Sequence, residues 1–387
     1  MLSLDDFERA ARRRLPRPVF GYVAGATERN ASHYDNHDAF RELGFVPRVL
    51  VDVSRRQQSA SLFGQTYAAP FGIAPMGISA LSAYRGDLVL AHAAAAANVP
   101  MVMSGSSLIR LEEVVAAAPG SWFQAYLPGE PSRILALLDR VERAGFATLV
   151  LTVDVAVLPN RENNVRNGFS TPLRPSLQLA LDGIGHPRWL LGTALRTLLR
   201  HGMPHFENSY AERGAPILSR SVARDFAARD HLSWEHLDLI RKRWRGRLVV
   251  KGVMHREDAR RAWDGGADGL IVSNHGGRQL DGTVSPLRVL PEIRAAAGDR
   301  VVMMDGGVRR GTDVLKALAL GADFVFVGRP FQYAAAIGGE AGVRHAVHLL
   351  FEEIGRDMAL LGIDALSELG PELLRLYGSA ALAGMEP

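Results

Sequence analysis

Residues 273–282, with the sequence SNHGGRQLDG, bring together side chains that can transfer a proton and bind an anion. The imidazole of His275 has an ordinary pKa that suits proton transfer near neutral pH. Arg278, three positions later, presents a planar guanidinium that matches a carboxylate. The two glycines between them let the backbone pass close to a flat ligand. Taken alone, the run is equally compatible with a glycine-rich turn that carries a capping histidine and a solvated arginine.

This run follows residues 269–272, GLIV, which predict a buried strand because they are apolar, branched and few. Similar segments recur along the chain, mostly separated by helix-length stretches, at 70–75, 101–103, 122–126, 148–153, 248–250, 270–272, 301–304 and 324–327. Eight strands that alternate with helices predict a closed (β/α)₈ TIM barrel of the α/β class. The alternative is a doubly wound sheet, which would carry G-x-G-x-x-G after an early strand, and the sequence has no such motif.

The predicted strands end in small or polar residues, at the edge where barrel enzymes build their active sites. In chain order these ends hold Pro75, Met76 and Gly77, Ser104, Gln124 and Tyr126, Thr152 and Asp154, Lys251, Ser273 and His275, Asp305, Gly306 and Gly307, and Gly328 and Arg329. Ordinary turns would favour Asn, Asp and Ser instead of Lys, His, Gln, Tyr and Arg. The pattern therefore indicates a functional site.

The chain has 387 residues and is 47% hydrophobic, so it can bury a large core. We expect one domain over 1–387, with an N-terminal helical segment at 1–45. The fourth and fifth predicted strands are too far apart for a single helix, so loop four should hold an insertion at about 162–232. The net charge of +4 is spread along the chain without a basic stripe, which argues against a nucleic-acid partner.

The absence of cysteine excludes disulfides and thiolate metal sites. The acidic N-terminus and the lack of a long apolar run favour a cytoplasmic protein without a membrane span. His33 and His37 have helical i, i+4 spacing and could bind a metal, but a closed metal site needs at least three protein ligands. We therefore expect two histidines on a surface helix and no metal.

The last two predicted strand ends indicate a phosphate site. Loops after strands seven and eight of such barrels offer backbone N–H groups near a helix N-terminus, here at 305–307 and Gly328. Arg309 and Arg329 can add bidentate contacts. A cofactor anchored there by a phosphate would extend over the mouth of the barrel.

Other strand ends suit a heteroaromatic ring above that mouth. Ser104, Gln124 and Thr152 can hydrogen-bond the edge of the ring. Lys251 can stabilise negative charge that the ring gains on reduction. These demands describe FMN.

The remaining polar residues suit a small acid bound over the ring. His275 can take a proton, and Asp154 can orient its imidazole and stabilise the charged form. Arg161 and Arg278 can clamp a carboxylate. Hydroxyls for the carboxylate and the developing keto oxygen are offered by Tyr22 and Tyr126.

The run SNHGGRQLDG, together with LVVKGV at 248–253, DGGVRRGTDV at 305–314 and VGRP at 327–330, resembles the FMN-dependent 2-hydroxy-acid dehydrogenase/oxidase family. The resemblance covers nearly the whole chain. It implies a homotetrameric flavoprotein that oxidises a 2-hydroxy acid. It also implies catalytic roles for His275, Asp154, Tyr126 and Lys251, substrate contacts from Tyr22, Arg161, Arg278 and Gly77, and FMN contacts from Pro75, Met76, Ser104, Gln124, Thr152, Lys251, Ser273, Asp305, Gly306, Gly307, Arg309, Gly328 and Arg329.

The stretches LVDVSRR at 50–56, TVDVAV at 152–157, HPRW at 186–189 and RHGMP at 200–204 are similar to the membrane-associated, mandelate-oxidising branch of this family. That likeness implies an (S)-2-hydroxy acid with a bulky or aromatic side chain and an electron acceptor such as a quinone or a carrier protein. Gly77, where relatives carry alanine, and Ser106, where some carry tryptophan, leave room for such a side chain.

Residues 177–205 are the candidate for peripheral contact with the inner face of the cell membrane. Trp189 and several leucines recur there at helical spacing, with arginines elsewhere on the helix. Basic amphipathic helices of this kind bind anionic membranes, but they also dock on protein cores or neighbouring subunits.

Several other functions remain open from the sequence. Within the family, the chain could be an L-lactate dehydrogenase or an oxidase that uses oxygen. From other classes, it could be an FMN-dependent isomerase or a non-catalytic peripheral membrane protein.

Overall fold

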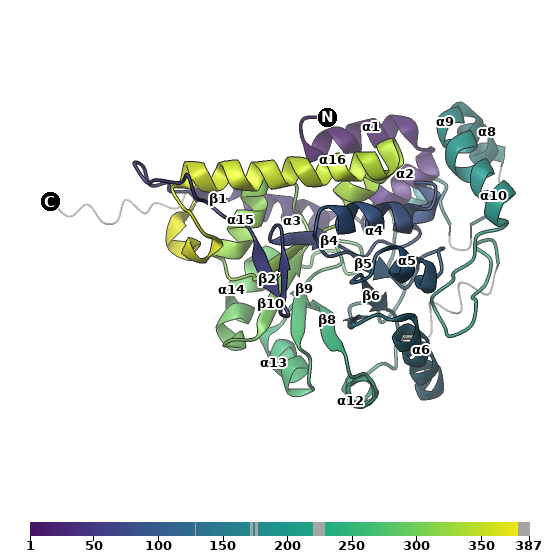
Figure 1. Ribbon diagram of the computed structural model, residues 1–387. Helices are drawn as coiled ribbons and strands as arrows, with labels where there is room; N and C mark the ends of the chain where they lie inside the picture. Colours follow the sequence, from purple (N-terminus) through teal and green to yellow (C-terminus); the bar gives the residue numbers. More distant parts are fainter. Residues whose placement is uncertain (128, 171–172, 175–176, 220–228, 378–387) are drawn as a thin grey trace.

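The computed structural model describes residues 1–127, 129–170, 173–174, 177–219 and 229–377 (Figure 1). Its centre is an eight-stranded parallel sheet in the order β4-β11-β10-β9-β8-β7-β6-β5. A bridge between Ile73 and Met101 joins the two outer strands, so the sheet closes. The strands are β4 (Phe71–Ile73), β5 (Val102–Ser104), β6 (Trp122–Ala125), β7 (Thr148–Thr152), β8 (Arg247–Val253), β9 (Gly269–Val272), β10 (Val301–Asp305) and β11 (Phe324–Val327). The predicted TIM barrel is confirmed.

The strands are buried on both faces, as parallel strands covered by helices must be. One apolar cluster, distinct from the main core, includes Ala74, Val102, Trp122, Val150, Val249, Ile271, Met303 and Phe326. Their strand neighbours, such as Leu149 and Leu151, belong to the main core cluster. Because side chains alternate along a strand, the residues two positions later share a face with the first cluster. They are Met76, Ser104, Gln124, Thr152, Lys251, Ser273, Asp305 and Gly328, a polar layer at the carboxyl end of the barrel.

Helices surround the barrel (Figure 1). They are α4 (Gly86–Ala96), α5 (Leu111–Ala117), α6 (Pro131–Ala144), α12 (Trp234–Arg243), α13 (Arg256–Asp264), α14 (Pro286–Ala297), α15 (Gly311–Ala319) and α16 (Arg329–Leu361). The chain of α16 breaks its helical path at Gly339, whose φ of 57° few other residues adopt. This long helix packs against α1 and α4.

The N-terminal segment forms α1 (Leu4–Arg14), α2 (Arg17–Ala24) and α3 (Ala31–Arg41). Ser3 and Asp6 form a capping box at the start of α1, and Pro16 separates α1 from α2. The hairpin of β2 (Ala60–Leu62) and β3 (Gln65–Tyr67) adds Leu62 and Tyr67 to the apolar cluster that includes Trp122. Two further strands, β1 (Leu43–Phe45) and β12 (Leu374–Leu376), pair antiparallel.

The insertion in loop four lies between β7 and β8. Its described elements are α7 (Glu162–Arg166), α8 (Leu177–Gly185), α9 (Pro187–Trp189), the π-helical stretch η2 (Leu190–Leu195) and α10 (Arg196–His201). Figure 1 places α8, α9 and α10 together at one side of the molecule. Residues 171–172, 175–176 and 220–228 of the predicted insertion lie outside the described residues. Within the described chain, none of the helices combines the length and the apolar character needed to cross a bilayer.

One expectation about this insertion was wrong. Trp189 does not share a face with the leucines, because its Nε1 donates to the Leu81 carbonyl at 2.7 Å and fixes the helix to the barrel. Arg196 also packs on the barrel side, with its guanidinium 3.9 Å from the centre of the Tyr84 ring. The leucines are exposed instead, with Leu191 at 62% and Leu199 at 77%.

Candidate active site

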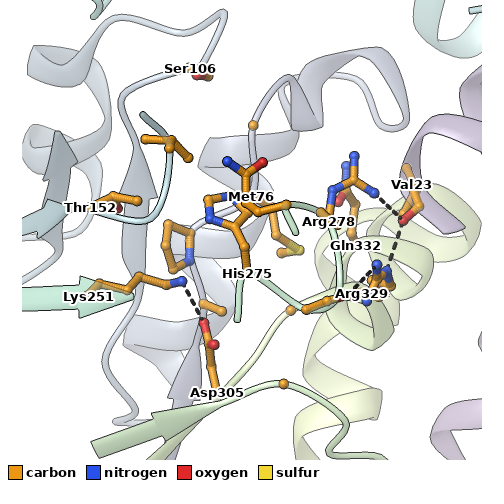
Figure 2. Close-up of a pocket in the computed structure, with 18 of the residues that line it drawn as sticks. Val23, Met76, Ser106, Thr152, Lys251, His275, Arg278, Asp305, Arg329 and Gln332 are labelled. Carbon is orange, nitrogen blue, oxygen red and sulfur yellow. Dashed lines mark hydrogen bonds and ion pairs between the residues drawn. The ribbon is translucent and has the colours of Figure 1, made fainter. Parts of the chain in front are cut away.

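A cavity of about 220 Å³ opens at the carboxyl end of the barrel (Figure 2). Its lining includes sixteen of the predicted residues, namely Tyr22, Pro75, Met76, Gly77, Tyr126, Thr152, Arg161, Lys251, His275, Arg278, Asp305, Gly306, Gly307, Arg309, Gly328 and Arg329. The other predicted residues, Asp154, Ser104, Gln124 and Ser273, lie behind this lining, and each hydrogen-bonds another predicted site residue. The polar layer of the barrel thus forms the floor of one cavity.

His275 and Asp154 form a buried pair above this floor. The His275 Nδ1 lies 2.9 Å from the Asp154 Oδ1, while Nε2 faces the Tyr126 hydroxyl at 3.5 Å. Burial lowers the pKa of His275, and the Asp154 carboxylate opposes that shift. Burial alone would raise the pKa of Asp154, but the charge and hydrogen bond of His275 outweigh it, so that pKa is lowered. The pair therefore provides a neutral imidazole at neutral pH beside an ionised carboxylate.

The backbone around this pair is tightly constrained. His275 has a φ of 58°, which is uncommon for a residue with a side chain and is typical of strained functional positions. Its N–H donates to the Ser273 Oγ at 3.0 Å, which stabilises the turn. On the neighbouring strand, a Cβ at Gly252 would lie 2.7 Å from the Asp154 side chain. Glycine at 252 therefore lets Asp154 approach the barrel mouth.

Lys251 is a buried cation with two partners. Its Nζ lies 3.1 Å from an Asp305 carboxylate oxygen and donates to the Ser273 Oγ at 2.9 Å. Burial opposes the charged form, but the carboxylates of Asp305 and Asp154 outweigh it and raise the pKa of Lys251. The ammonium is therefore protonated throughout the physiological pH range. Figure 2 shows its contact with Asp305.

Several buried polar atoms at the floor of the cavity lack partners among the described residues. The Gln124 Oε1 accepts from the Ser104 Oγ and the Gly105 N–H, both at 3.2 Å. This leaves the Gln124 Nε2, and likewise the Thr152 Oγ1, buried without a hydrogen-bond partner among the described residues. Because buried polar groups are nearly always hydrogen-bonded, these atoms indicate a polar ligand at the barrel floor. A flavin ring edge, with its carbonyl oxygens and ring nitrogens, fits this donor set.

Arg161 and Arg278 lie together on another side of the cavity. The Arg161 Nε donates to the Arg278 carbonyl at 3.1 Å, and the Arg278 guanidinium carbon lies 5.0 Å from the centre of the Tyr22 ring. Burial and the charge of Arg278 lower the pKa of Arg161 to about 10. Two guanidiniums that line the same cavity suit a bound carboxylate.

Arg329 and Arg309 line the same cavity beyond Arg278. Arg329 donates to the carbonyls of Val23, Gly25 and Gly276, so it connects the carboxyl end of α2 with the loop after β9 (Figure 2). Burial and the charge of Arg278 lower its pKa to about 9. This group of cations suits a phosphate.

The two histidines expected on a surface helix lie on α3. His33 and His37 are only partly exposed, and their ring centroids lie 4.9 Å apart. Burial and the neighbouring arginines 329 and 309 lower the pKa of His33 to about 2 and that of His37 to about 3. Both rings are therefore neutral beside the arginine group.

Arg229 and Phe206 are among the cavity residues that were not predicted from the sequence. Arg229 lines the cavity with its guanidinium carbon 4.6 Å from the centre of the Tyr126 ring, and Phe206 lines it from the insertion. Neither follows a barrel strand at a fixed spacing, so the strand-end pattern could not identify them. The only sequence signal for Phe206 was its apolar character within the insertion, and that signal is not specific.

Comparison with known proteins gives one consistent result. The sequence profile of FMN-dependent dehydrogenases matches residues 11–376. The chain is 38% identical to (S)-mandelate dehydrogenase of Pseudomonas putida over 98% of this chain and 95% of that protein. It is 39% identical to L-lactate dehydrogenase of Caulobacter vibrioides over 96% of this chain and 97% of that protein. The crystal structure of the monotopic membrane protein (S)-mandelate dehydrogenase superposes with a TM-score of 0.88 at 37% identity, over 97% and 99% of the two chains.

Proposed function

This chain belongs to the FMN-dependent dehydrogenase family, and on that premise we propose that it oxidises an (S)-2-hydroxy acid with a bulky or aromatic side chain, such as mandelate, to the 2-keto acid. FMN is its cofactor, and its relatives are dehydrogenases of 2-hydroxy acids. The observation that carries the proposal is the neutral His275, paired with Asp154, in the same cavity as Arg161 and Arg278.

The chain's own residues would have the following roles in the reaction. Arg161 and Arg278 bind the substrate carboxylate and fix the reacting carbon. The His275 Nε2 takes a proton from the substrate, and the Asp154 carboxylate stabilises the imidazolium that forms. Hydroxyls from Tyr22 and Tyr126 line the same space and suit the substrate oxygens.

The polar layer of the barrel would hold the cofactor. Bound FMN would supply the two-electron acceptor for this oxidation. Its ring edge would meet Gln124, Thr152 and Lys251, with Ser104 and Ser273 supporting them from behind. Its other proposed contacts are Pro75, Met76, Asp305, Gly306, Gly307, Gly328, Arg309 and Arg329, the arginines binding the phosphate.

The small residues at one end of the cavity support a bulky substrate. A Cβ at Gly77 would lie 3.2 Å from the Ser106 Cβ and 3.4 Å from the Tyr22 hydroxyl, so glycine leaves this space open. A pocket that gains the volume of a methyl group or more accepts a larger side chain.

We also propose that the loop-four insertion attaches the enzyme to the cytoplasmic face of a membrane, where a quinone or a carrier protein accepts the electrons. Support comes from the exposed apolar side chains of α8, η2 and α10, which are Leu177, Leu181, Ile184, Leu191, Leu195, Leu198 and Leu199. Exposed apolar surface is typical of interaction sites. A homotetramer remains a proposal that sedimentation of the purified enzyme would test.

The decisive experiment is anaerobic bleaching of the flavin absorbance by lactate, mandelate and longer 2-hydroxy acids. We expect mandelate to bleach fastest. Bleaching by lactate alone would favour an L-lactate dehydrogenase, the function named for several relatives. Failure of every acid to bleach bound flavin would favour an isomerase, and purification without flavin would favour a non-catalytic membrane protein.

A further inference from the structure

One part of the cavity wall comes from the insertion and not from the end of a barrel strand. Phe206 lines the cavity together with Gly77 and Ser106, and it is 6% exposed. The N–H of Glu207 donates to the Ser107 carbonyl at 3.2 Å, so the residue after Phe206 is fixed to the residue after Ser106. Phe206 therefore lies at the end of the cavity where small residues leave room for a substrate side chain.

The backbone of Phe206 is held on both sides. Its N–H donates to the Ala215 carbonyl at 3.1 Å, and its carbonyl accepts from the Gly214 N–H at 3.0 Å. A Cβ at Gly214 would lie 2.3 Å from the Phe206 carbonyl oxygen, so only glycine permits this close approach. Hydrogen bonds within the segment 204–217 thus hold the backbone that carries Phe206.

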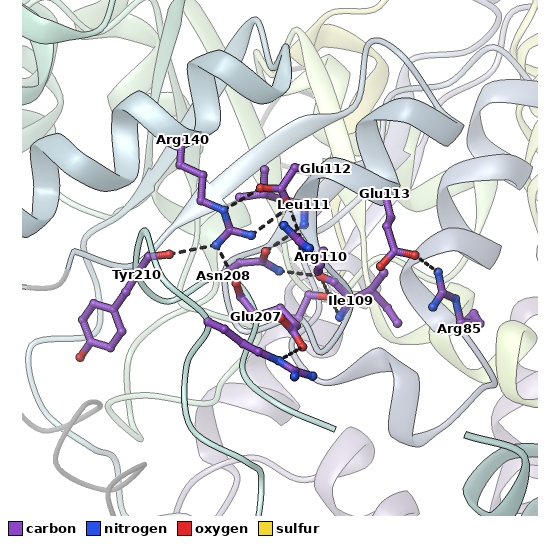
Figure 3. Close-up of polar contacts among 12 residues, drawn as sticks. Arg85, Ile109, Arg110, Leu111, Glu112, Glu113, Arg140, Glu207, Asn208 and Tyr210 are labelled. Carbon is purple, nitrogen blue, oxygen red and sulfur yellow. Dashed lines mark hydrogen bonds and ion pairs between the residues drawn. The ribbon is translucent and has the colours of Figure 1, made fainter. Parts of the chain in front are cut away.

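Arg140 on α6 fixes this segment to the outer helices of the barrel (Figure 3). Its guanidinium donates to the carbonyls of Glu207 at 2.7 Å and Tyr210 at 3.0 Å. The same guanidinium forms a bidentate pair with the Glu112 carboxylate at 2.8 and 2.9 Å. Arg140 is only 8% exposed, so breaking its contacts would leave an unpaired charge in the interior, and its attachment therefore resists displacement.

Asn208 makes a second attachment to the same helices. Its Oδ1 accepts from the Leu111 N–H at 2.9 Å, and its Nδ2 donates to the Ile109 carbonyl at 2.7 Å. Leu111 is the first residue of α5, so Asn208 caps a helix from a distant part of the chain. Both attachments hold residues that follow closely after Phe206 in the chain.

We propose that Phe206 is a specificity-determining residue that packs against the side chain of the 2-hydroxy acid, and that Arg140 is the positioning residue that holds it there. The inference rests on the proposed function, since the group that Phe206 meets is the substrate's aromatic ring. An aromatic pair gains stabilisation beyond its buried area, whereas the methyl group of lactate is too small to make that contact. The insertion thereby contributes to substrate choice.

The test compares kcat/KM for mandelate and for lactate in the purified, FMN-loaded enzyme. For Phe206→Ala we expect about a tenfold loss with mandelate, the size of one aromatic contact, and little change with lactate. For Phe206→Leu, which keeps most of the apolar volume, kcat/KM for mandelate should lie between the values for Phe206→Ala and for the wild type. Phe146→Ala is the matched control, because Phe146 is buried against Phe123 at the far end of α6. It should lower stability without changing the mandelate-to-lactate ratio.

Arg140→Met should shift the same ratio in the same direction as Phe206→Ala, and Arg140→Lys should shift it less. A merely structural role for Arg140 would lower the melting temperature and leave the ratio unchanged, which would overturn its assignment. Equal losses for both acids in Phe206→Ala, or a wild-type enzyme that prefers lactate, would overturn the role of Phe206 while the dehydrogenase function stands. Absence of bleaching by any acid would overturn the proposed function, and this assignment with it.

Discussion

The His275 Nδ1 lies 2.9 Å from the Asp154 Oδ1, which leaves Nε2 as the ring nitrogen that faces the cavity. The two residues follow strands β9 and β7, so a partner on a different loop sets the tautomer of the imidazole. This relationship makes the ring a proton acceptor at one nitrogen and anchors it at the other.

The first prediction concerns the pH dependence of flavin reduction. The working base is the neutral imidazole, and burial lowers the pKa of His275 below its usual 6.5. The rate of anaerobic bleaching should therefore hold steady from neutral pH to below pH 6.5 and fall only in more acidic buffer. Stopped-flow measurements across this range check the expectation, and a fall that begins above pH 7 would contradict it.

Substitutions of His275 and of Asp154 distinguish the roles of these two residues. His275→Ala should abolish bleaching while FMN stays bound. Asp154→Asn removes the charge that supports protonation, so it should move the acid limb to lower pH and slow bleaching roughly 100-fold or more, the scale of general-base catalysis. Normal bleaching by His275→Ala would refute the assignment of the base.

The second prediction concerns Lys251. Replacing it with methionine removes the cation at the cavity floor and leaves Asp305 without its 3.1 Å partner. We expect slower bleaching and a lower flavin reduction potential, because Lys251 would supply a counter-charge for the reduced ring. Dye-equilibration titration measures the potential. Lys251→Arg, which keeps the charge, is the control and should shift the potential less.

The barrel and its polar floor could be predicted from the sequence for a simple physical reason. Residues such as Gln124 and Lys251 end short apolar strands, and the alternation of side chains places them inside the barrel beyond Trp122 and Val249. Both the strands and the polar layer follow from local sequence alone.

Other features depend on contacts that no local pattern encodes. Phe206 reaches the cavity because Arg140, more than sixty positions away, holds its segment in place. Trp189 faces the barrel because the π-helical stretch after it breaks the helical spacing that grouped it with the leucines. The histidines of α3 are sheltered because that helix lies against the loop at Gly277, where a Cβ would be 2.7 Å from the His33 nitrogen.

The third prediction tests the room beside Gly77. In Gly77→Ala the new methyl would lie 3.2 Å from the Ser106 Cβ, so it would fill space reserved for the substrate. KM for mandelate should rise several-fold more than KM for lactate, as expected when one methyl is added to a pocket. Steady-state kinetics with both acids decide the matter, and equal changes would show that the space serves another purpose.

The fourth prediction concerns the exposed leucines of the insertion. Changing Leu191, Leu195 and Leu199 to serine together should abolish sedimentation with anionic vesicles, because these side chains supply the apolar contact. Anaerobic bleaching should be unchanged. Leu360→Ser, at a 69% exposed leucine on α16, is the control and should bind vesicles like the wild type. Vesicle binding that survives the triple change would place the membrane contact elsewhere.

The last prediction concerns Asp87, a fully buried carboxyl at the start of α4. It accepts from the Ser79 Oγ at 2.6 Å, two residues beyond Gly77, and so supports the turn that carries part of the cavity wall. Burial raises the pKa of Asp87 to about 6. The folded protein binds the Asp87 proton more tightly than the unfolded chain does. Protonation of Asp87 therefore stabilises the fold fully below about pH 4, and this stabilisation is lost as pH rises through 6.

Asp87→Asn keeps a neutral group at every pH, so its stability should fall less than that of the wild type between pH 4 and pH 7. The difference in unfolding free energy should be on the order of 1–3 kcal/mol, following from a shift of about two pKa units. Urea denaturation at several pH values measures it, with Asp299→Asn, at an exposed position, as the control. Parallel pH profiles for the wild type and Asp87→Asn would mean that Asp87 is ionised at a normal pKa. The turn at Ser79 would then be held by a charged group.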